Sequence, residues 1–288
     1  MNYKIYHEPV LLNYLLQHFM LDSSSIIVDG TMGFGGHAHA ILKTWPSISY
    51  LGFDKDVEAI KLARQRCHNF QSVDIIHAPF SSMHHIINER QITPTHFLLD
   101  LGVSSFQIDR SGRGFTFQQD EMLDMRMNLD QEKTAQQILN EFSKDALIRL
   151  FQYGADLQSP SRLVDEIMAY RSTKPFETTF DLVQCVKRGI FVKSRAQFIA
   201  MCTKVFQAVR IEVNNEMDEL TFTLRGMLNY TGALVAIISF QPNEDRFIKQ
   251  FVKENNLKKI NKKPFQSSYN ECKKNPREKS AKLRIFQV

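Results

Sequence analysis

Short apolar runs alternate with amphipathic stretches through the first third of the chain. The runs at 26–28, 50–54, 73–76 and 97–101 predict strands, and the segments 37–43 and 57–66 carry the apolar spacing of helices. Alternation of this kind specifies a parallel sheet with helices on both faces. The first third of the chain is therefore predicted to form an α/β sheet.

The pattern changes after about residue 106, where strand signal disappears for roughly a hundred residues. The expected helices cover 144–153, a segment opened by Ser159 and Pro160, and one apolar stripe from Phe198 to Leu220. Strand signal returns at 233–240 as an uninterrupted apolar run, followed by a helix at 245–254 and a last strand near 283–286. We predict a discontinuous α/β domain, 1–105 and 206–288, interrupted by an inserted helical domain, 106–205.

A cluster of glycines separates the first predicted strand from the first predicted helix. Gly30, Gly33, Gly35 and Gly36 lie within seven positions. Glycines at such a turn let the main chain approach a ligand near the helix N-terminus. Their spacing differs from the G-x-G-x-x-G dinucleotide pattern, and a tight turn without a ligand is the alternative.

Polar residues end the predicted strands at the same edge of the sheet. Asp54 ends the second strand, where nucleotide-binding α/β folds place a carboxylate on ribose hydroxyls. Its alternative role is to cap the following helix, for which Asp56 is equally suited. Phe80 follows the third strand, either as a face for adenine or as ordinary core.

Asp100 ends the fourth strand, and an aspartate is hard to explain as core there. Ser104, Ser105, Gln107 and Asp109 follow it. The carboxyl ends of parallel strands are where such folds bind ligands and react. Together with the glycine turn, these residues indicate an adenosine-type ligand.

Composition restricts the class of protein without naming a function. The chain is 43% hydrophobic and 23% charged, as is usual for globular proteins, and its apolar runs are too short to span a membrane. Residues 1–9 lack a secretory signal pattern, so we expect a cytoplasmic protein. The four scattered cysteines indicate packing or surface thiols rather than a zinc site or disulfides. A net charge of +5, concentrated near the C-terminus, suits a nucleic-acid partner or a solvated surface.

Seven segments occur in an order that identifies a resemblance. They are VDGTMGFGGH, LLDLGVSSFQID, RGFTF, LDMRM, FQAVRIEVNNE, EDR and NPREKSAKLR. The chain resembles the bacterial S-adenosylmethionine-dependent methyltransferases that modify N4 of a cytidine in 16S ribosomal RNA, in the decoding region of the small subunit. The resemblance implies a Rossmann-like methyltransferase sheet interrupted by an all-helical domain that recognises the substrate. It further implies the small ribosomal subunit as partner, with no membrane or metal, and a monomer or homodimer.

The resemblance also implies the residues of the site. The family's cofactor contacts match Gly35, Gly36, His37, Asp54, Phe80, Asp100 and Gln107. For methyl transfer, acceptors near N4 would stabilise the positive charge that develops on that nitrogen. We expect Asp100, Ser104 and Ser105 to supply them, with Asp109 as a secondary proton acceptor.

Cations and aromatic residues of the insertion are predicted to contact RNA, with a helical lid as the alternative. These residues are Arg113, Phe115, Phe117, Arg126, Lys187 and Arg188. The pair His84 and His85 is expected to lie on the surface rather than to bind a metal.

Three departures from the family pattern concern the substrate half. The chain has Ala155-Asp156 in place of Glu-Glu, Lys204 in place of arginine, and SFQPNEDR in place of Ser-Phe-His-Ser-Leu-Glu-Asp-Arg. Reduced activity or a shifted target is therefore one hypothesis, and a non-catalytic cofactor-binding ribosome assembly factor is the alternative function. An NAD-dependent dehydrogenase is a distant third, because the glycine spacing does not suit it.

Overall fold

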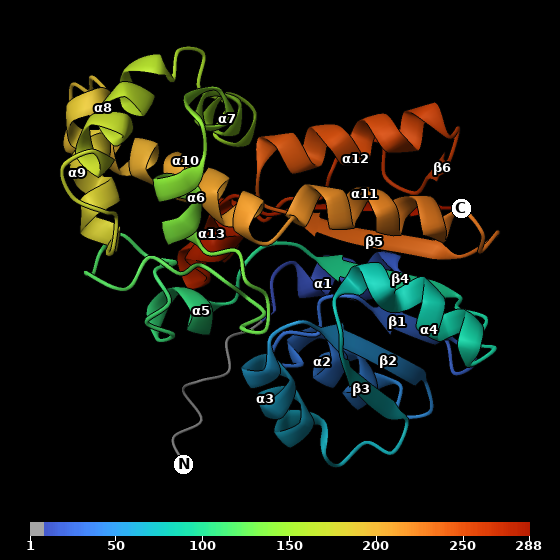
Figure 1. The fold of residues 1–288 in the computed structure, drawn as a ribbon. Helices are drawn as coiled ribbons and strands as arrows, with labels where there is room; N and C mark the ends of the chain where they lie inside the picture. The colour runs from blue at the N-terminus through green and yellow to red at the C-terminus, as the bar shows by residue number, and fades with distance from the viewer. Residues whose placement is uncertain (1–8) are drawn as a thin grey trace. The chain divides into compact units, whose positions relative to one another are not determined.

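The computed structural model describes residues 9–288, so the expectation about the N-terminal signal falls largely on residues that it does not describe. The chain divides into two compact units. The first combines Met1–Gly102 with Met217–Val288, and the second is Val103–Glu216 (Figure 1). In the described part of the chain, the longest and most apolar helices fall short of what crossing a membrane requires.

The first unit is built on a seven-stranded sheet in the order β3-β2-β1-β4-β5-β7-β6. The strands are β1 Ile26–Asp29, β2 Ser49–Asp54, β3 Val73–His77, β4 His96–Asp100, β5 Leu234–Ser239, β6 Lys258–Lys259 and β7 Lys282–Gln287. The first five strands are parallel, whereas β7 pairs antiparallel with both β5 and β6. This arrangement confirms the Rossmann-like sheet and adds an antiparallel edge to it.

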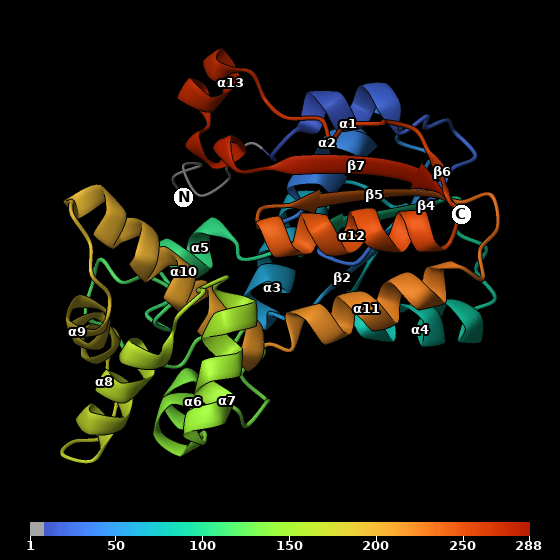
Figure 2. The ribbon, with the colours of Figure 1, turned by 90° about the horizontal axis from the view of Figure 1, so that it is seen from above.

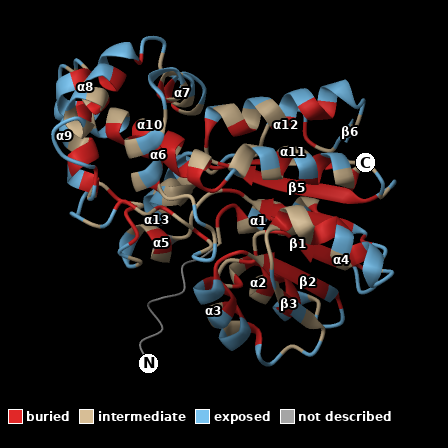
Figure 3. Cartoon of the chain, viewed as in Figure 1, coloured by how far each residue is buried: buried red, intermediate tan, exposed pale blue. Residues whose placement is uncertain are grey.

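Two apolar layers cover the two faces of this sheet. The helices of the first unit are α1 Leu12–His18, α2 Gly36–Thr44, α3 Val57–Cys67, α4 Met83–Glu89, α11 Glu216–Met227, α12 Pro242–Glu254 and α13 Tyr269–Lys274. Residues of α1, α2 and α3 pack with one alternate set of strand residues, and those of α4, α11 and α12 pack with the other set. Figure 2 shows α1 and α2 on one side of the strands and α4 and α11 on the other. Every residue of β5 is buried, as its uninterrupted apolar run predicts (Figure 3).

The described part of the second unit is helical around one core. Its helices are α5 Ser105–Asp109, α6 Ala135–Glu141, α7 Lys144–Arg149, α8 Ser161–Arg171, α9 Thr179–Gly189 and α10 Arg195–Val213, with a π-helical turn at Leu150–Gly154. Most of its buried apolar residues form a single cluster. The chain enters this unit after β4 and leaves it before β5.

The apolar stripe from Phe198 to Leu220 is two helices rather than one. Helix α10 ends at Val213 because the side chain of Asn214 donates to the Met125 carbonyl and accepts from the Met127 amide. Asn215 then adopts φ +49°, which stops the helix. The predicted boundary after residue 205 falls inside α10, and the second unit continues to Glu216.

Two local expectations are wrong. Helix α8 begins at Ser161, with Pro160 rather than Ser159 at the N-cap. His84 is buried, and its Nε2 lies 2.8 Å from the carbonyl oxygen of Thr223, because α11 packs closely against α4 at Gly226. His85 is exposed, as expected.

Candidate functional site

The glycine turn lies where the order of the parallel strands reverses. Strand β1 lies between β2 and β4. The turn that follows β1 is hydrogen-bonded to both neighbours, because Gly30 N–H donates to the Leu98 carbonyl and Met32 N–H donates to the Phe53 carbonyl. Gly33 and Gly35 have φ values of +51° and +70°, which glycine adopts without strain. Gly35 caps α2, and Gly36 and His37 are the first residues of that helix. The helix N-terminus is therefore presented at the switch point of the sheet.

Gly30 is needed for close packing beneath this turn. A Cβ added at Gly30 would lie 2.5 Å from Leu99 Cδ2 and 2.8 Å from Phe80 Cβ. We expect Gly30→Ala to lower the free energy of unfolding by about 3 kcal/mol, because the core must shift to admit the methyl group. Chemical denaturation measures this loss, with Gly33→Ala as a control expected to cost about 1 kcal/mol from its φ alone. Equal losses in the two variants would contradict the steric explanation.

Asp54 holds the glycine turn and the start of α3 together. Its Oδ2 accepts from Gly33 N–H at 2.8 Å, and its Oδ1 accepts from Asp56 N–H at 2.9 Å. Asp56 is the N-cap of α3 and accepts from Glu58 N–H, so the capping alternative for Asp54 is excluded. Burial raises the pKa of Asp54 to about 6, against the effect of these two hydrogen bonds. Each carboxylate oxygen keeps a further lone pair that a ligand hydroxyl can use.

Asp100 has an uncommitted carboxyl oxygen at the same edge. Its backbone N–H donates to Thr31 Oγ1, which fixes the end of β4 against the turn. The side-chain Oδ1 is buried and has no hydrogen-bond partner among residues 9–288. Burial raises the pKa of Asp100 to about 8, and the nearby carboxylates of Asp29 and Glu244 add to this. A buried polar atom without a partner indicates a missing ligand group.

His37 faces the other oxygen of Asp100 as a neutral ring. Its Nε2 lies 3.0 Å from the Val10 carbonyl, and its Nδ1 lies 3.8 Å from Asp100 Oδ2. Burial lowers the pKa of His37 to about 4, so the ring is neutral at pH 7. The tautomer that fits carries its proton on Nε2 and turns the Nδ1 lone pair toward Asp100. This contact is therefore not an ion pair, and it favours the protonated form of Asp100.

Phe80 lies mostly in the core. It begins a short 3₁₀ helix after β3, its side chain is 8% exposed, and it packs in the cluster that covers the α4 face. Its carbonyl accepts a hydrogen bond from Thr223 Oγ1. The alternative that Phe80 is a core residue explains the burial of most of its ring. A contact between the ring and the cofactor stays a prediction.

The remaining predicted residues belong to the second unit and are described within it. Ser104 and Gln107 form a reciprocal cap of α5: Ser104 Oγ accepts from Gln107 N–H, and Gln107 Oε1 accepts from Ser104 N–H at 2.8 Å. Gln107 is buried, and Asp109, the last residue of α5, is exposed. Ser105 is the first residue of this helix. The roles of these residues toward cofactor and RNA stay predictions.

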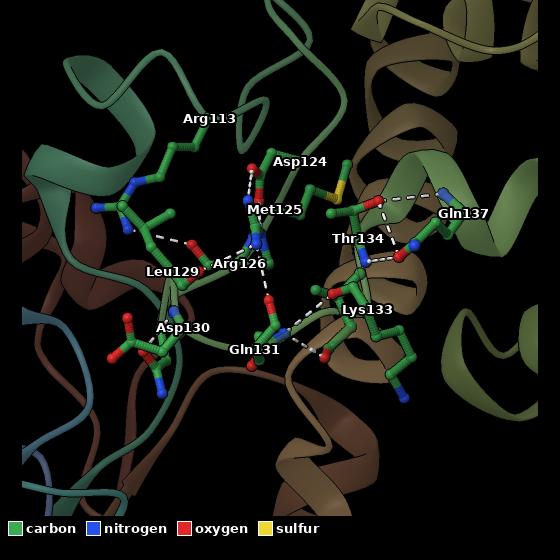
Figure 4. A network of polar contacts seen from close by, with 12 residues as sticks. Arg113, Asp124, Met125, Arg126, Leu129, Asp130, Gln131, Lys133, Thr134 and Gln137 are labelled. Carbon is green, nitrogen blue, oxygen red and sulfur yellow. Dashed lines mark hydrogen bonds and ion pairs between the residues drawn. The ribbon is translucent and has the colours of Figure 1, made fainter.

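Two of the cations predicted to contact RNA instead form hydrogen bonds within the second unit. Arg113 is buried, and its Nη1 donates to the carbonyls of Arg126 and Met127. Arg126 pairs with Asp124 through two hydrogen bonds and donates to two loop carbonyls as well (Figure 4). The RGFTF and LDMRM segments therefore contain arginines that order a loop, while Lys187 and Arg188 are exposed. Phe115 and Phe117 are partly buried against the core.

Glu244 is a site neighbour that the strand pattern does not reveal. It is buried, and its Oε2 accepts from the backbone N–H groups of Phe240 and Gln241 at the start of α12. The signal that could have found it is the capping spacing, an acid three residues after the cap residue. In the described residues, no group of three or more His, Cys, Asp or Glu side chains is placed to hold a metal ion.

The site fits a nucleoside ligand. The positive-φ glycines leave the main chain open, Asp54 has lone pairs for hydroxyls, and the Asp100 Oδ1 atom has no partner in the described chain. The fold and site define a Rossmann-like α/β protein, a class whose ligand sites lie at the switch point of the sheet.

The comparisons with known proteins narrow this class. The chain belongs to the MraW methylase family, whose model matches residues 4–288, and it is an S-adenosylmethionine-dependent methyltransferase. Among its relatives is a Thermotoga neapolitana protein, 36% identical over 99% of this chain and 97% of that protein. A Mycoplasma mobile protein is 35% identical over 98% and 97%. Both are named Ribosomal RNA small subunit methyltransferase H.

Proposed function

We propose that the protein transfers a methyl group from S-adenosylmethionine to the exocyclic N4 of a cytidine in the decoding region of 16S ribosomal RNA. The family and the names of its full-length relatives support this proposal. The structural observation that carries it is the buried, unpartnered Oδ1 of Asp100 beside the glycine turn. The substrate is the small ribosomal subunit or a late precursor, the reaction is cytoplasmic, and the protein acts as a monomer or homodimer.

The two units divide the work in this proposal. The first unit supplies most of the cofactor contacts, and the inserted helical unit recognises the RNA and adds Gln107 to the cofactor contacts. The proposed cofactor-binding residues are Gly35, Gly36, His37, Asp54, Phe80, Asp100 and Gln107. Asp54 accepts from the ribose hydroxyls through the lone pairs left by Gly33 and Asp56.

In the proposed reaction, the chain's residues position N4 and stabilise charge. The bound cofactor supplies an electrophilic methyl group on its sulfonium. The N4 lone pair is delocalised into the cytosine ring, so holding N4 in line with the bond to be broken supplies much of the acceleration. As the N–C bond forms and the S–C bond breaks, N4 becomes positive and loses one proton. Asp100 and the oxygens of residues 103–105 are the proposed acceptors near N4, with Asp109 as the secondary one.

The test is labelled methyl transfer to purified small subunits that lack the modification. The RNA is digested to nucleosides, and the labelled product is identified by mass spectrometry. We expect the labelled nucleoside to be N4-methylcytidine. Subunit and cofactor binding without any labelled nucleoside would instead support the assembly-factor alternative, which the comparisons do not favour.

The altered segment at the start of α12 makes a separate prediction. Gln241 is buried at the N-cap and Pro242 occupies the first helical position, so QPNE is a well-formed helix start. If the lost histidine and serine face the target base, restoring them through Gln241→His, Pro242→Ser and Asn243→Leu should raise kcat/KM about 10-fold. The methyl-transfer assay measures this, and Pro242→Ser alone is the control for the helix start. An unchanged kcat/KM in the triple variant would show that the segment is tolerated.

A further inference from the structure

The connection between α9 and α10 combines exposed cations with an exposed aromatic ring. Between Asp181 and Glu212 the chain has no acidic residue. The exposed cations of this stretch are Lys187, Arg188, Lys193 and Arg195, and Phe191 between them is 80% exposed. We call these five residues the α9–α10 tip.

None of the four cations is paired with an acid within the described chain. Several other cations of this unit are paired: Lys144 with Asp165, Lys174 with Asp181, and buried Arg210 with Glu216. Unpaired cations close together on one short segment produce a positive potential that attracts polyanions. The tip therefore differs from an ordinary charged surface of mixed sign.

The exposure of Phe191 is fixed by its neighbours. Ile190 has extended backbone angles, φ −121° and ψ 121°, and packs against the core of the unit. Successive side chains of an extended segment point to opposite sides, so Phe191 is directed away from that core. Ser194 then caps α10 by accepting from Gln197 N–H, and Gln197 Oε1 accepts from Lys193 N–H. The backbone on both sides of Phe191 is therefore fixed, and the ring lies between Arg188 and Lys193 in sequence.

We propose that the α9–α10 tip binds single-stranded ribosomal RNA, with Phe191 stacking on an unpaired base and the cations contacting phosphates. This inference rests on the proposed function and names the surface that engages the substrate. Aromatic rings flanked by cations bind single strands in this way, because every base offers a face for stacking and every nucleotide a phosphate. An acidic protein partner would account for the cations but would not require an exposed phenyl ring among them.

The experiment measures equilibrium binding of the full chain to small subunits lacking the modification, between 50 and 200 mM salt. Lys187→Gln with Arg188→Gln should weaken binding about 10-fold or more, and should reduce the slope of log K against log salt by about 2. The matched control is Arg149→Gln with Arg162→Gln, which removes two exposed cations from α7 and α8 of the same unit. We expect the control pair to bind as wild type does.

Phe191 is tested separately from charge. Phe191→Ala should weaken binding about 10-fold with the salt slope unchanged, because stacking releases no counterions. Phe191→Tyr should bind as wild type, and Phe191→Leu should bind as the alanine variant. Equal affinity and salt slope for the tip and control pairs would overturn the proposal, as would wild-type binding by Phe191→Leu. If wild type makes N4-methylcytidine while the tip variants bind normally, the surface assignment fails and the proposed function stands; if wild type makes none, the proposed function fails.

Discussion

Asp100→Ala is expected to reduce methyl transfer to small subunits by about 10²–10³-fold, the loss typical of removing one well-placed electrostatic group. The reason is that Asp100 Oδ1 is buried at the switch-point edge without a partner in the described chain, so we expect it to interact with the cofactor or substrate. Removing an unpaired buried carboxyl should not unfold the protein, because the Asp100 side chain makes no hydrogen bond within the described chain. Single-turnover kinetics at saturating cofactor measures the loss.

The same residue predicts an unusual pH dependence. The pKa of Asp100 is about 8 in the fold, above its ordinary value of 3.8. A raised carboxyl pKa means that the folded protein binds more protons than the unfolded chain, so stability is lost as the pH rises from about 4 through 8. Asp100→Asn removes this loss, and the variant should exceed wild type at pH 8.5 by at least about 1 kcal/mol in the free energy of unfolding.

Cofactor binding should release the proton that Asp100 carries. The positive charge of S-adenosylmethionine favours ionised Asp100, so wild type should release up to one proton on binding at pH 7. Titration calorimetry in buffers of different ionisation enthalpy measures this release, and Asp100→Asn should show less of it. Because burial also raises the pKa values of Asp29 and Asp54 to about 6, the difference between wild type and variant isolates Asp100. Identical proton release in both proteins would contradict a protonated Asp100.

Asp54→Ala is expected to weaken cofactor binding about 100-fold. The change removes the proposed ribose acceptor and also leaves the Gly33 and Asp56 N–H groups without the carboxylate that orders the turn. Hydrogen bonds to a charged group contribute about 1.5–3 kcal/mol each, which corresponds to a factor of this size. Calorimetric titration with S-adenosylmethionine measures the dissociation constant.

The neighbouring aspartate provides the control for Asp54. Asp56→Ala removes the N-cap of α3 and should cost about 1 kcal/mol of stability, with cofactor affinity kept. Asp54→Asn retains one acceptor oxygen and should fall between wild type and alanine in affinity. A dissociation constant that rises equally for the Asp54 and Asp56 variants would show that both act only through the fold.

Much of the sheet could be predicted because its strands are locally distinctive. The apolar runs locate β1 to β5, and because parallel strands end at a common edge, they predict Asp54 and Asp100 at that edge. The specific motifs identified the family, which the comparisons confirm. Helix α1 is only seven residues long and β6 consists of two exposed lysines, so neither produces a periodic pattern long enough to stand out.

Periodicity reports which side of an element is buried, but it does not report the partner against which that side packs. The stripe from Phe198 to Leu220 looks continuous, yet Asn214 binds the loop around Met125 and breaks it, because that loop reaches α10 only in the folded chain. Arg113 resembles an RNA contact in sequence and is instead buried on backbone carbonyls. The neutral state of His37 likewise depends on its burial in the folded chain, where its ring contacts the Val10 carbonyl, 27 positions away in sequence. Local pattern thus located the strands and the edge that carries the site, whereas long-range packing determined the charge states and the partners of the polar side chains.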